Sequence, residues 1–141
     1  MKITALTKSE MIRQIKEILL IDQAIVGERW SKENFLFDMP EKWGLSLQIL
    51  ANNLIVGFLV ASYKNNSIHI HRLAVGKEFQ KQNIGKQLVD EIQATAKRRN
   101  IKLITLKVLS TNTDAIRFYE RLGFVLKDRE NLNQWMQFRL N

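Results

Sequence analysis

The sequence predicts an α+β (α/β) fold, in which a mixed, mostly antiparallel β-sheet of about seven strands is flanked by about four helices. Segments with the apolar pattern of strands are interleaved with segments whose apolar residues recur every three or four positions, as in helices. The length of 141 residues is that of one compact domain, so we expect a single domain over residues 1–141. The composition, 45% hydrophobic and 26% charged, is typical of a globular protein.

The N-terminal part is predicted to hold a short strand over residues 2–6 and two helices. Thr7 and Glu10 have the spacing of a capping box and open the first helix, which carries an apolar stripe. Ser31 opens the second helix, and Pro40 marks its end. We therefore expect two helices before the main run of strands.

The middle of the chain is predicted to form three consecutive strands. Residues 45–50 and 54–63 are rich in apolar and β-branched residues and flank a turn at 51–53, which indicates a hairpin. A second turn at 64–66 leads into a strand over residues 67–75.

The C-terminal part returns to helical spacing. A helix is predicted from Ile84 to Asn100, followed by a buried strand over 101–109 and a helix over 112–122 that Gly123 terminates. Two further strands are expected over residues 124–127 and 134–140.

The net charge is +8, and residues 72–107 carry +6 of it. A basic stretch points to an anionic partner, so a nucleic-acid-binding domain is one alternative. The sequence contains no helix-turn-helix, zinc or aromatic RNA-binding motif, which makes nucleic acid an unlikely partner.

Absent features exclude several other classes. There is no cysteine, which excludes disulfides, thiolate metal sites and a cysteine nucleophile. The early apolar run, residues 18–21, is too short to span a membrane, and no signal-peptide pattern precedes it. We therefore expect a cytoplasmic protein with no membrane partner and no metal.

The connection between the strand over 67–75 and the helix that begins at Ile84 is a candidate anion site. Backbone amides at a helix start point outward with the positive end of the helix dipole behind them. Lys81 and Lys86 add full charges there, so a phosphate or pyrophosphate group is expected at residues 80–86. The alternative is an ordinary turn with solvated lysines.

Two motifs in this region resemble those of the GNAT superfamily of acetyl-CoA-dependent N-acetyltransferases. One is the loop Gln80-Lys81-Gln82-Asn83-Ile84-Gly85, in which Asn83 replaces the usual glycine. The other has its spacing intact and consists of Asn112, Ala115, Ile116, Tyr119, Gly123 and Phe124. Asparagine tolerates positive φ better than other non-glycine residues, so the loop is expected to keep its shape.

The resemblance implies a sheet that is splayed between its two central strands and an acetyl-CoA site in the gap. It implies that backbone amides of the loop bind the pyrophosphate, which assigns cofactor binding to Gln80, Lys81, Gln82, Asn83, Ile84, Gly85 and Lys86. It also implies that backbone groups of Leu73, Ala74 and Val75 bind the pantetheine arm and polarise the thioester, with Asn112 on the opposite side.

The resemblance further implies that Tyr119 lies near the sulfur and protonates the departing thiolate. A phenol can donate a proton and stay neutral at pH 7. Because the chain has no cysteine to carry an acyl group, direct attack by the amine in a ternary complex is the expected mechanism.

His69 and His71 are the candidate bases for deprotonating the amine. Histidine titrates near neutrality, and strand alternation places both on one face, together with Leu73 and Val75. The segment also resembles the matching strand of arylalkylamine N-acetyltransferases, whose paired histidines assist deprotonation. The alternative is a half-exposed strand face without catalytic function.

The acceptor stays open at this point, with a small-molecule amine favoured. Trp30-Ser31 and the second motif also resemble ribosomal-protein N-terminal acetyltransferases. In that group a glutamate serves as the general base, and Lys107 stands at the matching position here. A non-catalytic acetyl-CoA-binding module is another alternative. The oligomeric state is undetermined, with a homodimer as one option. Trp30, Trp43 and Trp135 are further candidates for the acceptor pocket, with core packing as the alternative. Glu28 and Glu33 are also candidates, with a solvated surface position as the alternative.

Overall fold

The computed structural model describes residues 1–141 and contains one seven-stranded sheet with the strand order β1-β2-β3-β4-β5-β7-β6. β4 and β5 run parallel, and every other neighbouring pair is antiparallel. This confirms the predicted fold class. The strands are β1 (Lys2–Ala5), β2 (Leu47–Ala51), β3 (Leu54–Lys64), β4 (Ser67–Val75), β5 (Leu103–Leu109), β6 (Val125–Glu130) and β7 (Asn133–Arg139).

Six α-helices surround the sheet, two more than expected. They are α1 (Lys8–Arg13), α2 (Ile15–Asp22), α3 (Lys32–Leu36), α4 (Lys42–Leu45), α5 (Ile84–Arg98) and α6 (Thr113–Arg121), with a 3₁₀ turn, η1, at Lys77–Phe79. One expected helix is divided into α1 and α2 at Gln14, and α4 was not predicted. None of the helices combines the length and the apolar character that a membrane span requires.

Two asparagine pairs make the tight turns of the β2–β3–β4 meander. Asn52 and Asn53 have φ of 53° and 67°, and Asn65 and Asn66 have φ of 51° and 61°. Positive φ at both central residues matches the twist of the flanking strands, and asparagine adopts it at low cost. The predicted hairpins are thereby confirmed.

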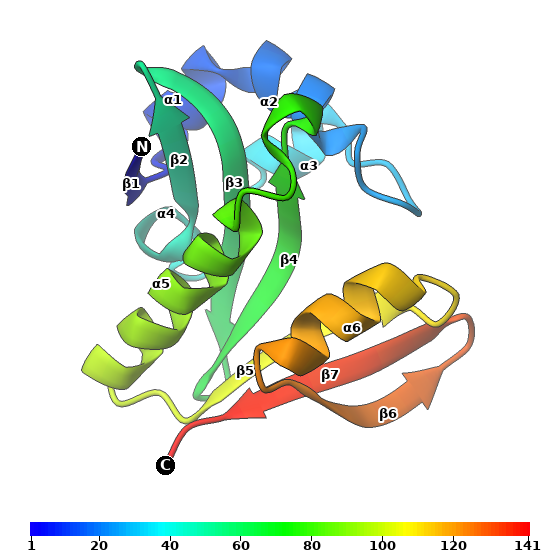
Figure 1. Ribbon diagram of the computed structural model, residues 1–141. Coiled ribbons are helices and arrows are strands. Elements are labelled where there is room, and N and C mark those ends of the chain that lie inside the picture. The colour runs from blue at the N-terminus through cyan, green and yellow to red at the C-terminus, as the bar shows by residue number, and fades with distance from the viewer.

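The sheet separates two apolar cores (Figure 1). On one face, α5 packs its buried stripe, which includes Leu88 and Ile92, against β3, β4 and β5. On the other face, α1, α2 and α3 contribute one buried apolar residue each, namely Met11, Ile18 and Phe35. We call these the α5 face and the α2 face of the sheet.

β4 and β5 pair along only part of their length. Their ladder runs from Ser67↔Leu103 to Ile70↔Leu106 and then stops, because the strands diverge. Figure 1 shows the β1–β4 part and the β5–β7 part of the sheet separating from a common end. The expected splay is present, and it leaves the facing edges of residues 71–75 and 107–109 without a strand partner.

A β-bulge at His71 changes the side-chain alternation of β4. Val60 pairs with Arg72 and Ala61 pairs with Ile70, so His71 has no partner on β3. Beyond the bulge, Ala74 packs into the core of the α2 face, while Leu73 and Val75 pack against the core of the α5 face. The expectation that Leu73 and Val75 share a face with the two histidines is therefore wrong, since the extra residue shifts the period of two.

Candidate active site

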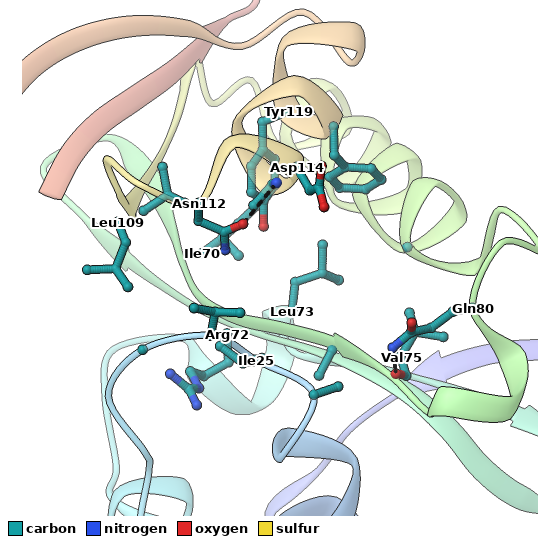
Figure 2. A pocket seen from close by; sticks show the side chains of 18 of the residues that line it. Ile25, Ile70, Arg72, Leu73, Val75, Gln80, Leu109, Asn112, Asp114 and Tyr119 are labelled. Atoms are coloured by element: carbon teal, nitrogen blue, oxygen red, sulfur yellow. Dashed lines mark hydrogen bonds between the residues drawn. The ribbon is translucent and has the colours of Figure 1, made fainter.

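The gap between β4 and β5 opens into a cleft of about 890 Å³. This volume is typical of a small-molecule or cofactor site. Its walls come from β4, β5, α6, the loop before α5 and the loop between α2 and α3 (Figure 2). The predicted site residues that line it are His69, His71, Leu73, Ala74, Val75, Gln80, Lys81, Asn83, Ile84, Gly85, Lys86, Asn112 and Tyr119; Gln82 does not line it.

The loop before α5, most of whose residues line this cleft, contains a run of backbone amides that make no hydrogen bond to a backbone carbonyl. None of the N–H groups of residues 80–86 donates to a backbone carbonyl, and the first helical bond runs from the Gln87 amide to the Asn83 carbonyl. Lys81 and Asn83 adopt positive φ, at 65° and 62°, which turns the loop into the helix. Asn83, which replaces the usual glycine, thus adopts the left-handed conformation that this position of the loop requires. The arrangement suits a bound anion.

Gly85 has a packing function within this loop. A Cβ atom at this position would lie 3.2 Å from Cζ of Phe118 on α6. The missing side chain therefore lets α6 approach the start of α5 closely. On the neighbouring strand, the Gln80 side-chain amide donates to the Val75 carbonyl at 3.2 Å and ties the loop to the end of β4.

Asn112 and Tyr119 face Leu73 across the opening (Figure 2). Asn112 is the N-cap of α6, and its Oδ1 accepts a hydrogen bond from the Ala115 amide at 3.2 Å. The Tyr119 ring is held by edge contacts with Phe118 and Phe124, with centroids 5.1 and 5.5 Å away. Burial raises the pKa of Tyr119, so the phenol stays protonated at neutral pH.

The two histidines lie side by side, with ring centroids 4.7 Å apart. His69 Nδ1 shares a hydrogen bond of 2.8 Å with Thr105 Oγ1, and His71 Nε2 shares one of 2.7 Å with Ser62 Oγ. Burial lowers the pKa of both rings to about 4, helped by the charges of neighbouring cations. Both are therefore neutral at pH 7, and their titration lies well below the near-neutral range expected of a free histidine.

Lys107 projects from β5 beside this histidine pair. Its ammonium lies 5.4 Å from the ring centroid of Trp135, and the same ring lies 5.3 Å from that of His69. Among the three tryptophans, Trp30 lines the cleft, whereas Trp43 and Trp135 do not. Of the two candidate glutamates, Glu28 lines the cleft and Glu33 does not.

The cleft reaches both faces of the sheet. Leu73 and Val75 pack on the α5 face, where α5 and α6 begin. His71 contacts Trp30, which belongs to the core of the α2 face. A ligand held by the amide loop and a second ligand arriving from the α2 face can therefore meet inside the gap.

Sequence reasoning missed a buried ion pair at the edge of the cleft. Arg72 donates to both carboxylate oxygens of Asp22, at 3.1 and 2.6 Å, and the two side chains are only 9% and 3% exposed. The available signals were an arginine within an apolar strand and an aspartate at the end of an apolar helix, and neither identifies its partner.

The positive charge of residues 72–107 is not gathered at the amide loop. Lys81 and Lys86 lie there, but Arg72 is paired with Asp22. Lys97, Arg98 and Arg99 lie at the far end of α5, about 22 Å from its start at 1.5 Å per residue. The cations at the C-terminal end of the helix therefore lie too far away to contact an anion bound at residues 80–86.

Comparisons with known proteins agree with this geometry. Residues 12–124 match the acetyltransferase (GNAT) family. The chain is 26% identical over 104 residues to the ribosomal protein bS18-alanine N-acetyltransferase of Escherichia coli, covering 74% of this chain and 70% of that protein.

Solved structures share the fold over nearly the whole chain. Ard1 from Thermoplasma volcanium superposes with a TM-score of 0.86 at 23% identity, covering 99% of this chain and 97% of that one. The PaiA N-acetyltransferase of Thermoplasma acidophilum, solved with coenzyme A, superposes with a TM-score of 0.81 at 22% identity, covering 99% and 98%. Because the family match spans most of the sequence, the chain belongs to the GNAT family and is an N-acetyltransferase.

Proposed function

We propose that the protein transfers the acetyl group of acetyl-CoA directly to a primary amine within a ternary complex, and that residues 1–141 form one catalytic domain. The main support is the gap between β4 and β5, which connects the unpaired amides of residues 80–86 to the histidine pair. Two substrates bound from opposite faces of the sheet would meet there without an intermediate carried by the protein.

The residues around the gap fit coenzyme A chemically. The free amides of residues 80–86 and the Lys81 charge suit its pyrophosphate. The unpaired edge of β4 at Leu73, Ala74 and Val75 offers backbone groups to the amides of the pantetheine arm and to the thioester oxygen. The side chain of Asn112 keeps its NH₂ group for the same arm, since only its oxygen is used as a cap.

Tyr119 and the histidine pair supply the proton transfers. As the amine nitrogen forms its bond to the acetyl carbon, the carbon–sulfur bond breaks and Tyr119 donates its proton to the departing sulfur. His69 or His71, neutral at pH 7, accepts the amine proton directly or through water. The low pKa of both rings means that the accepted proton is released readily to solvent.

The acceptor we favour is the α-amine of a polypeptide N-terminus. By its name, the bS18-alanine N-acetyltransferase to which the chain is similar acts on an alanine of ribosomal protein bS18, and the only amine that an alanine can offer is its α-amine. A small-molecule amine is the second candidate, because Lys107 stands where the resemblance to ribosomal-protein N-terminal acetyltransferases implies a glutamate that serves as base. Lys107 projects beside the histidines. A cation there repels an ammonium group, so an amine that is neutral near pH 7 suits the site better. An α-amine has a lower pKa than an alkylamine such as a lysine side chain.

The test is coenzyme A release with a panel of acceptors. Short peptides with free and with blocked N-termini, a lysine-side-chain amine, polyamines and aminoglycosides are each mixed with acetyl-CoA. We expect release with free-N-terminus peptides and none with blocked ones. Release with the small amines alone would establish the second candidate. Thermal stabilisation by acetyl-CoA without transfer to any amine would identify a binding module, and no stabilisation would refute the proposal.

A further inference from the structure

The loop between α2 and α3, residues 23–31, is anchored to β4 by Arg72. The guanidinium donates to both carboxylate oxygens of Asp22, the last residue of α2, and its Nη1 donates to the Glu28 carbonyl at 3.1 Å. Its central carbon lies 5.4 Å from the ring centroid of Trp30. One side chain therefore holds the loop at its start, in its middle and near its end.

The same loop touches β5 on the other side of the gap. Gly27 has φ +119°, and a Cβ atom at that position would lie 3.0 Å from Cδ1 of Leu109. Both residues line the cleft, and Leu109 lies beyond the last β4–β5 pair. The loop thus spans the open end of the gap, attached to β4 by Arg72 and packed against β5 through Gly27.

These contacts lie on the side of the cleft where the histidines are. His71, directly before Arg72, contacts Trp30 with ring centroids 6.1 Å apart. Figure 2 shows Arg72 directed toward the loop that carries Ile25, with Leu109 across the opening. The position of the loop therefore decides how much space is left next to the amine that reaches the histidines.

We propose that Arg72 is a positioning residue that fixes the 23–31 loop across the gap, and that the Gly27–Leu109 contact limits the size of the group next to the acceptor amine. This rests on the proposed acetyl transfer for its substrate consequence. The fixed loop itself is a property of the protein alone. Slender acceptors, in which the carbon that carries the amine bears no more than a small side group such as a methyl, fit under the loop.

The first experiment needs no acceptor. Amide hydrogen exchange is measured for the wild type, for Arg72→Lys and for the control Arg98→Lys, whose partner Glu91 is exposed on α5. Arg72→Lys keeps the charge but loses the paired bonds to Asp22 and the bond to Glu28. We expect the hydrogen-bonded amides of Gln23, Ala24 and Ile25, at the start of the loop, to exchange at least ~10-fold faster in Arg72→Lys, with α5 and the control unchanged. Unchanged exchange in the loop overturns the proposal.

The second experiment separates positioning from general stability. For Arg72→Lys we expect the acceptor KM to rise ~5-fold or more, while the acetyl-CoA KM and kcat change less than ~2-fold. Equal increases in both KM values would contradict a role confined to the loop. If the wild type acetylates no amine, the proposed function fails, and hydrogen exchange still decides whether Arg72 fixes the loop.

Leu109→Ala provides a test that keeps the ion pair. Shortening the Leu109 side chain removes its contact with Gly27 and widens the space under the loop. Acceptors with a bulky group next to the amine should therefore gain kcat/KM relative to slender ones. An unchanged ratio between bulky and slender acceptors overturns the size limit. This variant keeps Arg72 and Asp22, so it is informative even if Arg72→Lys does not fold.

Discussion

Tyr119 combines two properties that a proton donor needs at neutral pH. Its ring is fixed by Phe118 and Phe124, and burial raises its pKa, so the hydroxyl keeps its proton at neutral pH. The sequence predicted the residue through its motif, and the structure adds the aromatic contacts that orient it. Those contacts join residues on α6 and just after it, which is why one short motif contains them all.

Tyr119→Phe tests the proton-donor role. We expect kcat to fall about 100-fold, because a positioned acid contributes about that much, while acetyl-CoA affinity changes little. Steady-state kinetics and isothermal titration with acetyl-CoA measure the two effects. Tyr63→Phe is the control, since the Tyr63 hydroxyl bonds only Asn66 in an exposed turn. Similar rates for the two variants would exclude Tyr119 as the acid.

The histidine pair predicts an acid-sensitive fold. Both pKa values are lowered from 6.5 to about 4, so between these values the unfolded chain binds protons that the folded chain does not. The free energy of unfolding should therefore fall as pH falls from 6.5 to 4, by about 1 kcal/mol per pH unit for each histidine. Urea denaturation at several pH values measures it.

The double variant His69→Gln with His71→Gln serves as the comparison. Glutamine keeps a hydrogen-bonding amide but does not titrate, so stability should depend less on pH between 6.5 and 4. A pH dependence as steep as that of the wild type would show that these rings are not the source. Near pH 7 both proteins should have flat profiles, since the histidines stay neutral there.

At the scale of elements, local patterns predicted most of the helices and strands. β4 has the predicted boundaries, and the loop before α5 takes the shape its sequence indicated. The break between α1 and α2 depends on a distant partner, because the Gln14 side chain donates to Gln48 on β2 at 2.7 Å. A contact across 34 positions leaves no trace in the local spacing of apolar residues.

α4 was missed for a related reason. Lys42 is fully buried and donates to the carbonyls of Phe35 and Phe37, at 2.7 and 2.6 Å, at the end of α3. It also lies 4.7 Å from the ring centroid of Trp43. Nothing in the sequence distinguishes this lysine from a solvated one, so residues 42–44 have no predicted element and only Leu45 of α4 falls in a predicted strand.

Lys42→Met measures this attachment. The methionine matches the length of the lysine but removes the donor to the carbonyls of Asn34, Phe35 and Phe37, so we expect the free energy of unfolding to fall by about 3 kcal/mol. Urea denaturation measures it. Lys32→Met, at an exposed position on α3, should change stability by less than about 0.5 kcal/mol. Equal effects would mean that Lys42 does not anchor α3.

At the scale of the whole molecule, the positive charge is divided between distant regions. Lys81 and Lys86 lie at the start of α5, and Lys97, Arg98 and Arg99 lie at its end. Sequence position alone grouped them, because a 15-residue helix is one continuous segment in sequence but separates its ends in space. Cations in the last turn interact favourably with the negative end of the helix dipole, and this interaction does not depend on where the ligand binds.

Charge reversal at the two ends distinguishes these roles. Lys81→Glu should weaken acetyl-CoA binding by about 10-fold at low salt, and the loss should shrink as salt is added, because the charge at the amide loop is screened. Lys97→Glu should leave the affinity within about 2-fold, since it lies beyond a Debye length from the loop. Isothermal titration at two salt concentrations measures both. An equal loss in the two variants would point to a diffuse effect of net charge.

The bulge at His71 reverses the side-chain alternation of β4, because one extra residue moves every later side chain to the opposite face of the sheet. Upstream of it, odd-numbered side chains lie on the α2 face; downstream, odd-numbered side chains lie on the α5 face. Under the proposed function, these are the sides of the acceptor and of the cofactor, so one strand would contact both substrates. A saturation scan of residues 67–75 should show tolerance alternating along the strand and inverting at residue 71. Deleting His71 would remove the extra residue and restore pairing without a bulge, but every other side chain of β4 would stay on the face it already occupies.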